Sequence, residues 1–362
     1  MLQFDFDRLH RVGLSTALAE RARAMVADDE LSFSLARITS VHRETLDLHD
    51  GIAPASARPL PRLTRDLLDA GEALAVGDWV LAWQDAQGGR WVRGRVPPAT
   101  HIVRRDGDGT RHAVVSNVDF ALLVMGLDND FNLRRLERYL TLVHAGGVAP
   151  VVVLTKADVA AADATLRDER LAALGRRIPP GIEVIAVDAT DPQTAARLAH
   201  VARCGCTLVL LGSSGAGKST LTNNLLGRAV QDTGAVREND GRGMHTTTAR
   251  SLHLLPGGAC VIDTPGLRTL RPDVDEASLA ASFGDVETLA ARCRFRDCTH
   301  AGEPGCAVRE CVDPDRLRNF QKLLRETRRD TLSWVERRQQ LSAWKSRGKA
   351  MRARMKMKRG ER

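Results

Sequence analysis

The sequence predicts a multidomain α/β protein, and three stretches of different character support this prediction. Residues 33–105 hold short alternating apolar and polar segments with turn signals between them, a pattern typical of a small β-barrel. From residue 112 onward, apolar runs alternate with helical patterns, which favours a parallel sheet covered by helices on both faces. Beyond about residue 272 come four clustered cysteines and a charged helical pattern, so a third, helical region is expected.

Length and composition fit a globular chain with two or three domains. The chain has 362 residues, of which 43% are hydrophobic. The sequence lacks an apolar run of the ~18–20 residues that a membrane span needs, and its start lacks a signal-peptide pattern. We therefore expect a cytoplasmic protein without a membrane partner. No sequence feature demands a dimer, so a monomer is expected.

The net charge of +8 is unevenly distributed. Residues 316–362 carry 17 Lys and Arg against 4 Asp and Glu, whereas the rest of the chain carries 36 against 41. The basic segment also contains Trp334 and Trp344. An acidic body with a basic, tryptophan-bearing tail indicates a polyanionic partner, and structured RNA fits this description.

The first two domains are expected to be an N-terminal helical extension and the barrel. One amphipathic helix is expected within residues 14–30. For the barrel, an OB-type fold is the first interpretation and an SH3-like fold the second; both commonly bind nucleic acid. The expected bounds are 1–32 for the extension, 33–110 for the barrel, 111–271 for the sheet domain, 272–325 for the cysteine-containing region and 326–362 for the basic helical tail.

A phosphate-binding loop lies between an apolar strand and a helix, within "LVLLGSSGAGKSTLTNNLLG". It fits the pattern G-x-x-x-x-G-K-[ST] at every fixed position, and Thr220 follows it. Its backbone N–H groups and the helix N-terminus would hold phosphate oxygens, Lys218 would reach the β- and γ-phosphates, and Ser219 would ligate Mg²⁺. The loop residues are Gly212, Ser213, Ser214, Gly215, Ala216, Gly217, Lys218 and Ser219.

Two downstream stretches could complete a nucleotide site. Asp263 ends an apolar strand and opens the pattern Asp-x-x-Gly, in which the carboxylate could hold Mg²⁺ through water and the Gly266 N–H could contact the γ-phosphate. Alternatively, this stretch is a simple turn. Thr246, Thr247 and Thr248 lie in a glycine-rich polar segment, and one of them could complete the Mg²⁺ shell; the alternative is a threonine-rich edge strand.

A guanine-reading tetrapeptide, Thr155-Lys156-Ala157-Asp158, precedes the phosphate loop by about fifty residues. Asp158 can accept hydrogen bonds from N1–H and the exocyclic amine of guanine, which adenine does not offer as a pair. The Lys156 stem can lie over the base. A second loop, residues 187–189, could contact the base oxygen. Alternatively, the tetrapeptide belongs to a solvated loop.

In ordinary GTPases the base reader follows the phosphate loop, whereas here it comes first. A parallel sheet tolerates this change, because joining the old termini and opening another loop keeps every ligand position at the same sheet edge. The order base reader, phosphate loop, threonines and Asp-x-x-Gly, preceded by a barrel and followed by a Cys/His cluster, resembles the circularly permuted GTPases of small-ribosomal-subunit biogenesis, the RsgA/YjeQ family. The resemblance covers about residues 33–325.

The resemblance implies an OB-fold, a circularly permuted GTPase domain and a zinc-containing C-terminal region. It also implies GTP hydrolysis to GDP and phosphate, stimulated by the small ribosomal subunit and its rRNA during late maturation. Residues 155, 156 and 158 would read guanine, 212–220 would hold the phosphates, and 263–266 would form the metal-side switch. The reader has Thr155 where Asn is usual, which leaves open how the loop-fixing hydrogen bond is made.

A metal site is expected from Cys293, Cys298, His300 and Cys306. Three thiolates and one imidazole form a closed tetrahedral set that suits one structural Zn²⁺. Cys311 is the spare cysteine and the alternative to His300 as fourth ligand. Unligated thiols in a loop are the other alternative.

Catalysis poses one difficulty, because Ras-like enzymes place a water-orienting glutamine where this chain has Leu267. A slow intrinsic rate is therefore expected, with the water positioned by another side chain or by the partner. His245 is the candidate, and the alternative is a loop histidine without this role. Lys218, Ser219, Asp263 and Gly266 are the other expected catalytic residues. A nucleotide-gated rRNA-binding switch with negligible hydrolysis is the alternative function, and Asp158 disfavours an ATP-using enzyme.

Overall fold

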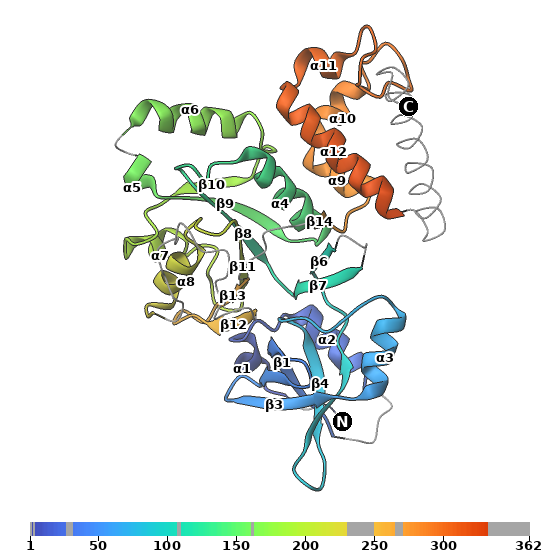
Figure 1. The fold of residues 1–362 in the computed structure, drawn as a ribbon. Coiled ribbons are helices and arrows are strands. Elements are labelled where there is room, and N and C mark those ends of the chain that lie inside the picture. The colour runs from blue at the N-terminus through green and yellow to red at the C-terminus, as the bar shows by residue number, and fades with distance from the viewer. Residues whose placement is uncertain are drawn as a thin grey trace, which may run out of the picture.

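The computed structural model describes residues 2, 4–26, 32–106, 110–160, 163–229, 250–264 and 271–331. Its three main parts are an N-terminal barrel, a central sheet with helices and a C-terminal helical region, and Figure 1 shows the central part between the other two. In the described part of the chain, no helix is both long enough and apolar enough to cross a membrane. The predicted threonines and His245, the residues from Pro265 to Leu270, and both tail tryptophans lie outside the described residues.

The N-terminal extension contains two helices where the sequence analysis expected one. They are α1, Phe6–His10, and α2, Thr16–Ala24. The side chains of Asp5 and Ser15 each accept a backbone N–H of the first turn and so begin the two helices. Buried leucines and alanines of both helices join the main hydrophobic core. The extension is therefore packed into the molecule rather than only attached to it.

The barrel has five strands and closes on itself. β1 pairs with β2 on one side and with β4 on the other, and the order β1-β2-β3-β5-β4 returns to β1. This closed arrangement, with a helix between the third and fourth strands, is the OB-type barrel that was the first interpretation. Its elements are β1 Ser34–Val41, β2 Leu46–His49, β3 Pro54–Pro59, α3 Pro61–Asp69, β4 Trp79–Gln84 and β5 Arg90–Arg95.

A small three-stranded sheet lies beside the central sheet, between the barrel and the C-terminal helices (Figure 1). The hairpin of β6, His101–Arg105, and β7, Arg111–Ser116, pairs with β14, Arg271–Pro272. Asp273 follows β14 and accepts hydrogen bonds from two arginines of the hairpin. The small sheet therefore joins the chain segment that enters the central domain, residues 101–116, to the segment that leaves it, residues 271–273.

The central sheet has the order β10-β9-β8-β11-β13-β12, in which the first five strands are parallel. β12 is antiparallel to β13 and also pairs with β1, so the barrel and the central domain share one eleven-stranded sheet. The prediction of a parallel sheet is thus confirmed for these five strands, whereas the edge strand β12 is antiparallel. The bounds are β8 Phe120–Gly126, β9 Ala149–Thr155, β10 Glu183–Ala186, β11 Thr207–Leu211, β12 Ser251–Leu254 and β13 Cys260–Asp263.

Helices cover both faces of the central sheet, as its apolar strands require. Side chains of α4 and α6 pack on one face, and those of α8 and the segment after α7 pack on the other. Successive residues of β8, β9 and β11 alternate between these two cores. The helices are α4 Leu133–Ala145, α5 Ala157–Ala160, α6 Ala164–Gly175, α7 Gln193–Arg197 and α8 Lys218–Leu226.

The C-terminal region is a helical unit with its own small core around Phe283. It docks on α4 through a buried polar network, in which Glu137 accepts hydrogen bonds from Arg316 at 2.8 Å and from Asn319 at 2.6 Å. Its elements are α9 Glu276–Ser282, α10 Gly284–Ala290, α11 Ala307–Cys311 and α12 Pro314–Thr331.

Candidate functional site

The strand order reverses between β8 and β11, and this point defines the candidate site. From β8 the chain moves outward to β9 and β10, and then returns to β11 on the other side of β8 before reaching β13. In open α/β sheets, ligands bind outside the carboxyl ends of the strands at such a switch point. The loops after β8, β9, β11 and β13 therefore surround the expected nucleotide position.

The phosphate loop follows β11 and leads directly into α8. Gly217 has a φ of 91° and precedes the first helical residue, so the turn uses a backbone region that favours glycine. A Cβ on Gly217 would also lie 3.3 Å from the Thr155 hydroxyl oxygen. Ser219 and Thr220 lie in the first turn of α8, where free N–H groups and the helix dipole favour an anion.

Lys218 is 8% exposed, and its amine donates to two carbonyl oxygens of the loop itself, those of Gly212 at 2.9 Å and Ser213 at 2.6 Å. Burial lowers the pKa of Lys218, while Asp263 and Asp130 act in the opposite direction. A buried amine with carbonyl partners is poised to exchange them for phosphate oxygens, which bear full negative charge.

Asp263 ends β13 and is 3% exposed. It pairs in register with Leu210 of β11, which places it beside the start of the phosphate loop. Burial raises the pKa of Asp263, and the attraction of Lys218 opposes this shift. A carboxylate held out of water at a phosphate site is the kind of group that a divalent cation neutralises. Thr264 is also buried and donates to the Leu210 carbonyl at 2.6 Å.

The base-reading tetrapeptide lies beside the phosphate loop, at the end of β9. The Thr155 hydroxyl donates a hydrogen bond to the Ala216 carbonyl at 2.7 Å. Threonine therefore makes the loop-fixing hydrogen bond at the position where asparagine is usual. Lys156 has a φ of 58°, an uncommon conformation for a residue with a side chain. Asp158 is exposed in the first turn of α5, where its carboxylate is accessible to a base.

The second expected base loop, residues 187–189, is hydrogen-bonded to the base-reading tetrapeptide on one side and to α8 on the other. Ala157 donates its backbone N–H to the Val187 carbonyl at 3.2 Å. Asn224 of α8 donates to the carbonyls of Ala189 at 3.2 Å and Asp191 at 2.7 Å. The base reader, the base loop and the helix of the phosphate loop are therefore linked by hydrogen bonds at one sheet edge.

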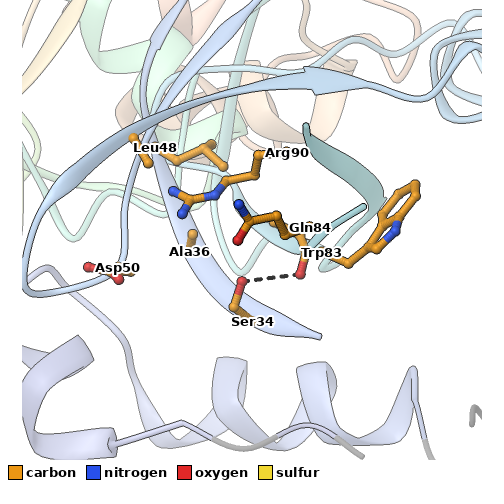
Figure 2. A pocket seen from close by; sticks show the side chains of 9 residues that line it. Ser34, Ala36, Leu48, Asp50, Trp83, Gln84 and Arg90 are labelled. Carbon is orange, nitrogen blue, oxygen red and sulfur yellow. Dashed lines mark hydrogen bonds between the residues drawn. The ribbon is translucent and has the colours of Figure 1, made fainter. Parts of the chain in front are cut away.

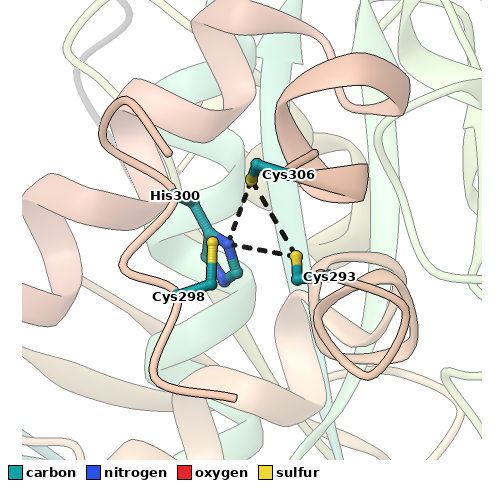
Figure 3. Close-up of side chains that lie close together, drawn as sticks. All are labelled: Cys293, Cys298, His300 and Cys306. Atoms are coloured by element: carbon teal, nitrogen blue, oxygen red, sulfur yellow. Dashed lines mark hydrogen bonds between the residues drawn. The ribbon is translucent and has the colours of Figure 1, made fainter. Parts of the chain in front are cut away.

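The four predicted metal ligands converge in the C-terminal region (Figure 3). The Nδ1 atom of His300 lies 3.4 Å from the Cys306 sulfur and 3.7 Å from the Cys293 sulfur, and all four ligand atoms lie within 4.8 Å of one another. Ligands about 2.0–2.3 Å from a tetrahedral zinc lie roughly 3.3–3.8 Å apart, so the set fits zinc. Cys311, the alternative ligand, is exposed at the end of α11 and outside the cluster.

Comparisons with known proteins agree with this geometry. Residues 96–272 match the family model described as RsgA GTPase. A relative from Xanthomonas campestris pv. campestris (strain B100), named small ribosomal subunit biogenesis GTPase RsgA, is 46% identical over 296 residues, which cover 80% of this chain and 79% of the relative. The chain belongs to the RsgA GTPase family. As a member of this family it is a GTP hydrolase.

Two solved structures show the family fold. YjeQ from Thermotoga maritima has a TM-score of 0.59 at 23% identity and covers 82% of this chain and 98% of its own. YloQ, described as a circularly permuted GTPase, has a TM-score of 0.57 at 21% identity, with 85% and 99% covered. A second relative named small ribosomal subunit biogenesis GTPase RsgA, from Xanthomonas axonopodis pv. citri (strain 306), is 46% identical over 299 residues, 80% of each chain. The predicted circular permutation is therefore confirmed.

The barrel adds a polar cavity of about 250 Å³, which Figure 2 shows from close by. In this view Gln84 of β4 and Arg90 of β5 lie together, and the Trp83 ring points away from them. The Trp83 ring stacks on Trp91 with centroids 6.4 Å apart. Gln84 and Arg90 form one cross-strand pair and Trp83 and Trp91 the next, so the arginine and the stacked rings face opposite sides of the β4–β5 ladder.

Sequence analysis missed three side chains at the switch point, namely Asp128, Asp130 and Arg135. They belong to the loop after β8 and the start of α4, and they contact the base reader, the phosphate loop or each other. The available signal was the acidic stretch "LDND" directly after the apolar strand "FALLVMG". Polar residues at the carboxyl end of a buried parallel strand point to the ligand edge.

Proposed function

We propose that this chain binds GTP at the β8/β11 switch point and hydrolyses it while it assists late maturation of the small ribosomal subunit, which stimulates the reaction. The observation that carries the proposal is the junction of base reader and phosphate loop through Thr155 and Ala216. The relatives' name, small ribosomal subunit biogenesis GTPase, supports the choice of partner. Work on this partner would take place in the cytoplasm, and a monomer suffices for it.

In the proposed reaction, water attacks the γ-phosphate of GTP. Lys218 and the N–H groups of residues 212–220 hold the phosphates and stabilise the charge that develops. Mg²⁺, with Ser219 as ligand and Asp263 acting through water, would neutralise phosphate charge. Asp158 and the Lys156 stem select guanine. The roles expected from the sequence are kept for Gly266, for His245 and for the switch threonines Thr246 and Thr247.

For the C-terminal region we propose one structural zinc ion on Cys293, Cys298, His300 and Cys306. Arg292, Arg294 and Arg296 are exposed next to these ligands, and Arg294 lies over the ring of Phe295, itself 41% exposed. Exposed arginines with an aromatic ring suit rRNA. We expect charge reversal of the three arginines to weaken binding to small subunits; unchanged binding would contradict this role. The domain bounds and the basic tail, 326–362, stay as predicted from the sequence.

The test is GTP turnover by the purified chain, alone and with purified small ribosomal subunits. Large subunits and ATP are the partner and substrate controls, and Lys218→Ala is the inactive control. A slow basal rate that rises strongly with small subunits alone would support the proposal. Tight GTP binding without stimulation would favour the alternative, a nucleotide-gated rRNA-binding switch, which Leu267 at the position of the usual glutamine leaves open.

A further inference from the structure

The loop between β8 and α4, residues 127–132, lies between the two nucleotide-binding segments. β8 is the strand between β9, which carries the base reader, and β11, which carries the phosphate loop. Gly126 at the end of β8 pairs in register with Thr155 at the end of β9, and Leu123 pairs with Leu211. The loop is therefore placed to contact both segments at once.

On one side, Asp128 holds the base reader. Its Oδ2 accepts a hydrogen bond from Lys156 Nζ at 2.7 Å, and Oδ1 accepts the backbone N–H of Asp130 at 3.1 Å. Partial burial would raise the pKa of Asp128, but these hydrogen bonds and the lysine charge outweigh it and lower the pKa. The carboxylate is thus charged at neutral pH and fixes the direction of the Lys156 stem, whose backbone already adopts an uncommon conformation.

On the other side, Asp130 holds the phosphate loop. Its carboxylate accepts a hydrogen bond from the Ser213 hydroxyl and pairs with Arg135 at 2.6 Å. The second oxygen, Oδ2, accepts the Gly126 N–H at 3.2 Å. Asp130 is only 14% exposed at the side chain, so it is held more firmly than Asp128, whose side chain is 32% exposed.

The strand end is shaped to admit this loop. A Cβ on Gly126 would lie 2.4 Å from Asp128 Oδ1 and 3.3 Å from the Asp130 Cβ. Only glycine lets both aspartates fold back over the end of β8. The glycine, the two aspartates and their three side-chain partners form one arrangement at the switch point.

We propose that Asp128 and Asp130 are positioning residues for the guanine nucleotide, in which Asp128 orients Lys156 at the base end and Asp130 fixes Ser213 at the phosphate end. Both act through another residue rather than by touching the nucleotide. This inference rests on the proposed GTP site. It names the loop after β8 as the element that sets the spacing between the two halves of that site.

The experiment measures the affinity of the full chain for a fluorescent GDP analogue by titration. The variants are Asp128→Asn and Asp130→Asn, with Asp168→Asn as matched control, because Asp168 is an exposed aspartate of α6 that pairs with neighbouring Arg167. An ion pair whose side chains are 34% and 32% exposed predicts about a threefold loss for Asp128→Asn. A charge-assisted, mostly buried contact predicts about a tenfold loss for Asp130→Asn. The control should bind like the unsubstituted chain.

Double-mutant cycles separate positioning from general destabilisation. The loss caused by Asp128→Asn should vanish in a Lys156→Ala background, and that of Asp130→Asn should vanish in a Ser213→Ala background. The crossed pair, Asp128→Asn with Ser213→Ala, should be additive. Thermal unfolding is measured for each variant, and if Asp130→Asn does not fold, Ser213→Ala removes the same contact from its other side.

The outcomes distinguish failure of the positioning role from failure of the proposed GTP site. GDP binding by the unsubstituted chain with no loss in either variant, or with losses that are additive in both cycles, overturns the positioning role and leaves the GTP site standing. Failure of the unsubstituted chain to bind GDP overturns the proposed function and this inference with it.

Discussion

Substituting Glu137 tests how the C-terminal region is held on the central domain. Glu137 is 2% exposed and accepts hydrogen bonds from Arg316 and Asn319, with Arg177 3.6 Å away. Glu137→Leu would leave two buried guanidinium groups without this carboxylate. Removing one partner of a buried ion pair costs about 3–5 kcal/mol. Asp285 still pairs with Arg316 at 2.7 Å, so we expect the lower end, about 3 kcal/mol.

The assay is thermal unfolding followed by circular dichroism. An unfolding entropy of about 2.1 cal/mol/K per residue gives roughly 1.3 °C per kcal/mol for 362 residues, so Glu137→Leu should lower Tm by about 4 °C. Glu276→Leu is the matched control, because Glu276 pairs with Arg328 of α12 at 2.9 Å with both side chains more than half exposed. Such a pair contributes about 0–1 kcal/mol, so the control should lose under about 1.5 °C. Equal Tm values for the two variants would refute the argument that burial makes the Glu137 contacts important.

Three further predictions concern the barrel, the three-stranded sheet and the metal cluster. Arg37→Leu should destabilise the chain by at least about 4 kcal/mol in urea unfolding, because this buried guanidinium donates to acceptors of the extension, barrel and central domain, which would lose their partner. Burial lowers the pKa of His101 to about 4. Because the unfolded state takes up the proton near pH 6.5, the free energy of unfolding should fall by up to about 3 kcal/mol between pH 6.5 and pH 4. In unfolding measured across this pH range, His101→Leu should flatten the profile. Cys306→Ala should abolish zinc retention in elemental analysis while Cys311→Ala keeps about one ion per chain, and equal zinc in both would contradict the Cys₃His set.

Much of the fold could be predicted, because the elements that were predicted well carry strong periodic signals. The parallel strands β8, β9, β11 and β13 are short, mostly buried apolar runs, and α4 ends at Gly146 as its sequence indicated. The edge strand β12 was not predicted, since pairing with β1 depends on how two distant parts of the chain dock. The division of the N-terminal extension into two helices depends on caps that a hydrophobic pattern does not reveal.

The site was predictable where chemistry dictates both residue type and spacing. A phosphate loop needs glycines and Lys218 at fixed positions, and a tetrahedral metal site needs four ligands in a short segment, so both appear as motifs. Asp128 and Asp130 do not form a motif, because their roles come from contacts with residues 28 and 83 positions away. Thr155 shows the reverse case, in which an unusual residue makes the expected contact through its hydroxyl.

The circular permutation changes what the metal-side switch is connected to. In this chain order, Asp263 ends β13, and β14 of the three-stranded sheet begins at Arg271, eight residues further along the chain. β14 pairs with β6, and Asp273 forms ion pairs with Arg105 and Arg111 at 2.5 and 2.6 Å. Helix α9 of the C-terminal region begins three residues later. A displacement that starts at the metal-side switch therefore has a short covalent route to both the hairpin beside the barrel and the region with the metal cluster. In an unpermuted GTPase the segment after the Asp-x-x-Gly stretch would continue into the central domain, so the permuted order itself connects the proposed nucleotide site to the region with the metal cluster, whose arginines are proposed to contact rRNA.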